Sequence, residues 1–126
     1  MDTVSHDPIG ENAYLTDPQE RKWSMWAHAS ALLGILIPLT NFVGPLLIWL
    51  AKKNTLPLAT EQAREALNFN LTVVLVAVVG ILLWWFGIGW LVLIPLGIAW
   101  ISLTIVAIVA TGSGRPYRYP FTLRLV

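Results

Sequence analysis

Two long stretches without a charged residue constrain this chain more than any other feature. Neither residues 24–51 nor residues 66–114 contain Asp, Glu, Lys or Arg. A helix needs roughly 20 apolar residues to cross a bilayer, so the second stretch is long enough for two spans. Only 12% of the residues are charged and 56% are hydrophobic, and a small soluble domain has too little interior to hide that much apolar surface. The sequence therefore predicts an all-α integral membrane protein.

The second uncharged stretch divides at Gly87-Ile88-Gly89, which stands between Trp84-Trp85 and Trp90. Glycine favours tight turns, and tryptophan is enriched at membrane–water interfaces. We therefore expect a long C-terminal transmembrane hairpin with helices over about 58–86 and 90–111. Gly112 and Gly114, followed by Pro116, are typical of the end of a helix.

The first uncharged stretch contains Ile37-Pro38 and Gly44-Pro45, and it allows two interpretations. It is either one kinked helix over 24–51 or a short hairpin with helices over about 20–37 and 42–53. The hairpin places every basic residue on one face of the membrane, and the tendency of cytoplasmic loops to be basic favours that arrangement. The arms are short for a full crossing, so the hairpin either spans a thinned bilayer or is re-entrant. The same tendency predicts a multi-pass inner-membrane protein with both termini in the cytoplasm.

Residues 1–20 differ in composition from the rest of the chain. They carry five of the seven acidic residues, and Pro8, Gly10 and Pro18 interrupt any helical periodicity. Such a composition is typical of a flexible, solvated tail, with partner binding as the alternative. We therefore divide the chain into a flexible acidic cytoplasmic tail, residues 1–20, and a single helical membrane domain, residues 21–126.

Four polar residues form a stripe on the third expected helix. Glu61, Glu65, Asn68 and Thr72 are four, three and four residues apart, which places them on one helical face. An unsatisfied amide is costly inside a bilayer, so the stripe should face other helices. It serves either as a contact between helices or as a polar path for a substrate or ion. Arg64 has the spacing for an ion pair with Glu61.

His28 is the polar residue of the first helix that is best placed to meet this stripe. It is interpreted as a packing residue, with proton sensing and metal binding as weaker alternatives. We expect the amide of Asn68 to dock the first hairpin through His28 or Ser30, and we expect Asn41 to lie too far away. Ala27, Ala31 and Gly34 give the first helix a face of small residues, as close helix packing requires.

The sequence offers no recognisable catalytic site. It has no Cys, and neither glycine pair continues as a phosphate-binding loop. We predict no catalytic residues, no metal and no cofactor, and a protein that is not an enzyme. The expected partners are the lipid bilayer and a second membrane protein or further copies of this chain, not nucleic acid. The expected function is that of an accessory or scaffold subunit acting by helix-mediated assembly, with an oligomeric transporter or channel as the alternative.

Several motifs resemble a known family. They are the segment Trp26 to Gly34, then Gly44-Pro45, Trp49 with Lys52-Lys53, Glu65 to Asn70, and Arg118-Tyr119-Pro120. Together they resemble a Tic20-like group of small bacterial membrane proteins (a domain of unknown function), related to a chloroplast inner-envelope import component. Members commonly have glutamine at the position of Asn70. The resemblance implies four membrane helices with both ends in the cytoplasm, and it implies no catalytic residues.

Overall fold

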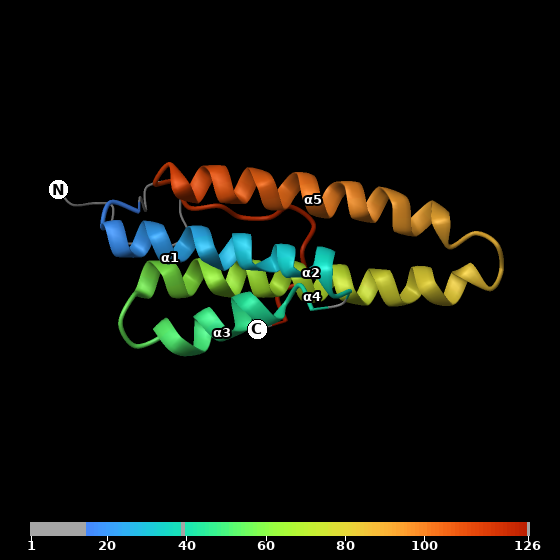
Figure 1. Cartoon of the computed structure of the whole chain (residues 1–126), viewed down its shortest axis with the longest axis horizontal. Coiled ribbons are helices and arrows are strands. Elements are labelled where there is room, and N and C mark those ends of the chain that lie inside the picture. Colours follow the sequence, from blue (N-terminus) through green and yellow to red (C-terminus); the bar gives the residue numbers. More distant parts are fainter. Residues whose placement is uncertain (1–14, 39, 126) are drawn as a thin grey trace.

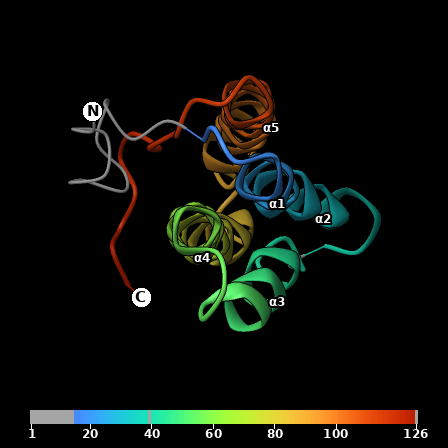
Figure 2. The same ribbon diagram turned by 90° about the vertical axis from the view of Figure 1, so that its left-hand side faces the viewer.

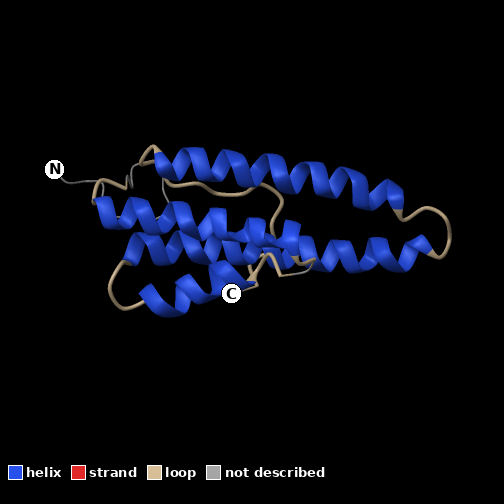
Figure 3. Ribbon diagram, viewed as in Figure 1, coloured by secondary structure: helices blue, strands red, loops and turns tan. Residues whose placement is uncertain are grey.

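The computed structural model describes residues 15–38 and 40–125, and the regular elements in this part of the chain are all helices (Figures 1 and 3). They are α1 (Pro18–Ala29), the 3₁₀ helix η2 (Ser30–Leu32), α2 (Leu33–Leu36), α3 (Val43–Lys52), α4 (Pro57–Trp84) and α5 (Trp90–Gly112). α1, η2 and α2 follow one another as the first arm of a short hairpin, and α3 is its second arm. The predicted fold class, a short N-terminal hairpin followed by a long C-terminal one, is confirmed.

The long hairpin consists of α4 and α5, both of which are long and apolar enough to cross a membrane. At 1.5 Å per residue they are about 42 Å and about 34 Å long, which exceeds the roughly 30 Å hydrocarbon core of a bilayer. The turn between them depends on two glycines. Gly87 has a φ of +76°, which side chains with a Cβ rarely adopt. A Cβ on Gly89 would collide with the backbone of Gly80 and Trp84.

The short hairpin reaches only partway along the long one (Figure 1). Its first arm ends at Leu36, one residue before Ile37-Pro38, because a proline disfavours helical geometry in the residue that precedes it. Asn41, at the turn, bonds to Asn70 in the middle of α4. The hairpin interpretation of residues 24–51 is therefore correct, and the single kinked helix is wrong.

The two arms of the short hairpin approach each other at a glycine. A Cβ on Gly44 of α3 would overlap the side chain of Ser30 in η2. On the inner face of the first arm, Ala27 and Ala31 are completely buried. Small residues therefore allow the short hairpin to pack tightly within itself and against its neighbours, as the sequence predicted.

The end of the expected tail is part of the helical domain. Residues 1–14 of that tail lie outside the described residues, but α1 already begins at Pro18, with Asp17 as its N-cap. Glu20 is buried, and its carboxylate accepts the backbone N–H groups of Leu58 (3.2 Å) and Ala59 (2.7 Å). These are free donors in the first turn of α4, where negative charge is also favoured by the helix dipole. α1 thus begins before residue 20, and the division of the chain into a tail and a membrane domain stays a prediction.

Backbone hydrogen bonds close the C-terminus of α5. Gly114 has a φ of +88°, Arg115 N–H donates to the Ala110 carbonyl (2.9 Å), and Gly114 N–H donates to the Thr111 carbonyl (3.1 Å). These two bonds define a Schellman motif. The glycine stop that the sequence predicted is present.

Burial is concentrated at the end of the molecule where the charged residues lie. All but one of the buried residues of α4 lie between Ala59 and Asn70, and those of α5 are Thr104, Ala107 and Thr111. Towards the α4–α5 turn both helices expose large apolar side chains, including Leu75, Val79, Leu82, Leu91, Ile94 and Ile98. Such an outer surface is stable in hydrocarbon and not in water.

Candidate functional site

The chain after α5 turns back and runs along α4. This C-terminal segment (residues 115–125) passes along one side of the long hairpin, while α1 packs on the other side (Figure 2). It has no regular secondary structure, so its backbone N–H groups need other acceptors.

Side chains of α4 supply three of those acceptors. Gln62 Oε1 accepts from Tyr117 N–H (3.1 Å), and Glu65 Oε2 accepts from Tyr119 N–H (2.6 Å). About two turns further along, Thr72 Oγ1 accepts from Leu123 N–H (3.0 Å). Polar side chains spaced along one helix thus hold an extended segment at a depth where an unpaired backbone group would be costly.

Glu65 also forms an ion pair with the same segment. Its carboxylate is 3% exposed and accepts from Arg124 Nη1 at 2.8 and 3.0 Å. A buried carboxylate is stable only with a charged partner and full hydrogen bonding. Arg124 and the Tyr119 N–H group provide both.

His28 connects three segments of the chain. Its Nδ1 lies 2.7 Å from the Tyr119 hydroxyl, and its Nε2 lies 2.8 Å from Gln62 Oε1. Because the Tyr117 N–H group can only donate, the Gln62 atom that it meets must be the oxygen. His28 therefore donates from Nε2 and accepts the Tyr119 O–H at Nδ1. Burial lowers the pKa of His28 to about 4, only partly opposed by the hydrogen bond to Gln62, so the imidazole is neutral at pH 7.

Aromatic packing surrounds this network. The ring of Tyr119 stacks on Phe69 of α4 with centroids 3.9 Å apart, and Tyr117 meets Tyr119 edge to face at 4.9 Å. Tyr119, Phe69, Ala66 and Ala107 form the buried apolar core. Tyr119 therefore belongs at once to the core between α4 and α5 and to the polar network that reaches α1.

A second polar cluster lies at the turn of the short hairpin. Asn70 Oδ1 accepts from Asn41 Nδ2 (2.7 Å) and from Trp100 Nε1 of α5 (2.8 Å), while Asn70 Nδ2 donates to the Ala66 carbonyl (2.8 Å). One amide therefore joins the short hairpin to both long helices.

The amide that joins the short hairpin to α4 is Asn70, and the docking contact expected for Asn68 stays a prediction. Both ring nitrogens of His28 are used by Gln62 and Tyr119, and the side chain of Ser30 lies against Gly44 of α3. Asn70 accepts from Asn41 at the turn of the hairpin, a pair that the sequence did not predict. The hairpin is short, so its turn reaches only the middle of α4.

The four residues of the predicted stripe do not share one environment in the structure. Glu65 and Thr72 bind the C-terminal segment, Asn68 is buried, and Glu61 instead pairs with Arg64 at 3.3 Å on a part-exposed surface. Among the motif residues, Gly44 and Pro45 are buried at the start of α3, Trp49 is half-buried, and Asn70 and Tyr119 lie in the two polar clusters. Pro120 is exposed.

Sequence reasoning missed Gln62, Trp100, Glu20 and Arg124. Gln62 lies three residues before Glu65, a spacing that suits a shared helical face, but Glu61, four residues before Glu65, suits it equally. Nothing in the local sequence indicated the other three. Within residues 15–38 and 40–125 no group of three or more His, Asp or Glu side chains is placed to hold a metal ion.

Comparison with known proteins identifies the family. Residues 19–126 match the MamF/MmsF group, described as the magnetosome magnetite crystal formation protein family, and no curated protein and no solved structure matches the chain. The Tic20-like resemblance is therefore wrong, because the family model that matches the chain is the MamF/MmsF one. With its two long apolar helices, the chain is a membrane protein that belongs to the magnetosome magnetite crystal formation protein family.

Proposed function

We propose that this chain is a non-enzymatic component of the magnetosome membrane that assists magnetite crystal formation by assembling with other membrane helices. The family match supports the setting in crystal formation. The observation that carries the assembly mechanism is the outer face of α5, where Ile94, Ile98 and Ile101 lie one turn apart and are all exposed. Ile98 is 64% exposed.

The charge distribution also supports an indirect role in crystal formation. Residues 66–114, which include the α4–α5 turn, carry no charged residue and no histidine. Iron ions are bound in proteins mainly by carboxylate, imidazole and thiolate ligands. With both termini in the cytoplasm, the side of the membrane that faces the crystal would present the apolar turn Trp85 to Gly89. Partners are then the means by which the chain affects the crystal.

The arrangement of the polar stripe argues against the alternative of a channel. Glu65 and Thr72 already bind the C-terminal segment, and Glu65 is 3% exposed. A path along this face would require that segment to leave.

Alanine substitution of the exposed isoleucines tests the proposal. Lipid accepts any apolar side chain, whereas packing between membrane helices depends on side-chain shape. The variant Ile94→Ala/Ile98→Ala/Ile101→Ala should therefore reach the membrane at normal levels but yield altered crystals. It would be expressed in cells that lack the natural protein, and crystal size would be measured by electron microscopy.

The matched control is Glu61→Gln, which removes a part-exposed ion pair of small energetic value. It should leave crystal size unchanged. Normal crystals from the triple alanine variant, at normal membrane levels, would refute assembly through this face of α5.

A further inference from the structure

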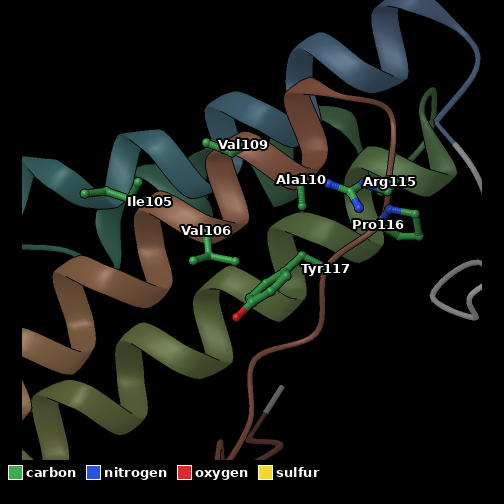
Figure 4. A pocket seen from close by; sticks show the side chains of 7 residues that line it. All are labelled: Ile105, Val106, Val109, Ala110, Arg115, Pro116 and Tyr117. Atoms are coloured by element: carbon green, nitrogen blue, oxygen red, sulfur yellow. The ribbon is translucent and has the colours of Figure 1, made fainter.

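A groove runs along α5 at the end of the molecule where the charged residues lie. Its volume is about 430 Å³, and it is lined by Ile105, Val106, Val109 and Ala110 of α5 and by the first three residues of the C-terminal segment, Arg115, Pro116 and Tyr117. Figure 4 shows Tyr117 and Val106 at one part of the groove and Arg115 beyond Ala110. The volume falls in the range of roughly 300–1,000 Å³ that is typical of ligand sites.

The groove is apolar along its length and positively charged at its end. Arg115 is exposed, and within the described residues no carboxylate forms an ion pair with it. The Arg21 guanidinium lies beside Gly114, the residue before Arg115. Glu65, which binds the neighbouring part of the C-terminal segment, is already paired with Arg124. Two guanidinium groups therefore stand where α5 leaves the apolar region.

This combination matches the chemistry of a phospholipid. The last turns of α5 lie at the level where a bilayer changes from hydrocarbon to headgroups, because α5 is about 34 Å long and the hydrocarbon core is about 30 Å thick. An acyl chain lying against Ile105, Val106 and Val109 would bring the phosphate of the same molecule to Arg115. Basic pockets at this depth favour anionic headgroups.

We propose that the groove between α5 and the C-terminal segment binds one anionic phospholipid, with an acyl chain along α5 and its phosphate at Arg115. The inference is independent of the proposed role in crystal formation. The bound lipid covers apolar surface that the C-terminal segment leaves open, and it neutralises Arg115.

The experiment uses the purified full-length protein in detergent and counts bound lipids by native mass spectrometry. Dioleoyl phosphatidylglycerol and dioleoyl phosphatidylcholine are added separately at equal concentrations. Phosphatidylglycerol should bind more tightly. Arg115→Gln should weaken its binding about five-fold, the factor that corresponds to one basic residue near an anionic surface, and should hardly change that of phosphatidylcholine.

Two matched controls separate the groove from general effects. Arg118→Gln removes the same charge at an exposed position outside the groove and should change binding less than two-fold. Val106→Trp fills the groove and should weaken both lipids, whereas Ile98→Trp, elsewhere on α5, should not. An excess of inorganic phosphate should not displace the lipid.

Three results would overturn the proposal. The first is an equal loss of phosphatidylglycerol binding in Arg115→Gln and Arg118→Gln, which would indicate that the lipid is attracted by the overall charge of the protein. The second is unchanged binding in Val106→Trp, which would exclude the groove. The third is complete displacement by inorganic phosphate, which would indicate an anion site without a lipid chain.

Discussion

At the scale of single residues, His28 has the largest influence on how the segments of this protein meet. Its imidazole joins α1 to Gln62 of α4 and to Tyr119 of the C-terminal segment. The bond to Gln62 requires a proton on Nε2, and the bond from the Tyr119 hydroxyl requires an unprotonated Nδ1. A second proton on Nδ1 would remove the acceptor of the Tyr119 O–H group and would place a charge in a fully buried site.

The protein should therefore lose stability as the pH falls below about 6.5. The pKa of His28 is about 4 in the folded protein and 6.5 in its ordinary range, so the unfolded chain takes up the proton first. The stabilisation is complete above pH 6.5 and decreases towards pH 4, with a loss of about 2 kcal/mol by pH 5. The measurement is the unfolding midpoint in mild detergent at several pH values.

The comparison with His28→Gln isolates this contribution, because carboxylates that titrate in the same range are common to both proteins. The difference in stability between the two should shrink as the pH falls from 6.5 to 5. His6→Gln should keep the pH dependence of the original chain. Parallel pH profiles for the original chain and His28→Gln would show that this imidazole does not titrate on unfolding.

At the scale of elements, the short hairpin depends on how closely its arms approach. Gly44 has no space for a Cβ because Ser30 fills it. Asn41 then fixes the turn against Asn70 and, through it, against Trp100. Packing of small residues and one amide cluster thus position an element that reaches only the middle of α4.

Gly44→Ala should destabilise the protein by about 1–3 kcal/mol, the usual cost of overpacking a tight contact. Gly97→Ala is the matched control, because it is also a helical glycine but a Cβ there meets nothing within 4 Å. It should be neutral or stabilising by up to about 1 kcal/mol, since alanine is the better helix former. Unfolding in mild detergent would be followed by circular dichroism.

A second substitution shows whether Ser30 is the cause. Ser30→Gly removes the side chain that a Cβ at position 44 would meet, so Gly44→Ala/Ser30→Gly should recover part of the loss relative to Ser30→Gly alone. Equal effects of Gly44→Ala and Gly97→Ala would contradict the close contact.

At the scale of the whole molecule, the charged residues and most of the buried residues lie at the same end. All charged residues fall in three segments, residues 2–22, 52–65 and 115–124, and the buried polar clusters lie between the helices that these segments join. The other end consists of α4, α5 and their turn (Figure 1), and many large apolar side chains of these two helices are exposed there. One end therefore fits water and headgroups, and the apolar outer surfaces of α4 and α5 fit hydrocarbon up to their turn.

This asymmetry predicts the response to a membrane-impermeant thiol reagent. The chain has no cysteine, so single cysteines can be introduced without background. In vesicles of known orientation, Asn54→Cys and Ser113→Cys should be labelled from the cytoplasmic side and Ile88→Cys only from the opposite side. Labelling of Asn54→Cys and Ser113→Cys from different sides would contradict the arrangement of paired hairpins.

Much of the architecture was predictable because it depends on local sequence. The uncharged stretches determined the membrane class, the glycine turn at 87–89 determined the long hairpin, and Gly114 determined the end of α5. Each of these features acts within a few residues of the chain or through composition alone. The first hairpin followed from the distribution of basic residues relative to the membrane, which is again a property of the sequence.

Only the tertiary structure decided which polar groups meet. His28 and Tyr119 are 91 residues apart, and Asn41 and Asn70 are 29 residues apart. Their contacts depend on how far each helix extends and how it is rotated. Adjacent residues on a helix point about 100° apart, so spacing along α4 could not decide between Glu61, which faces outward to Arg64, and Gln62, which meets His28. Gln62, Glu65 and Thr72 of α4 accept hydrogen bonds from the C-terminal segment. That segment is extended and has no periodicity from which its position could be predicted. The hydrogen bonds between distant segments form only when the helices and the C-terminal segment have packed together, so they could not be predicted from the sequence alone.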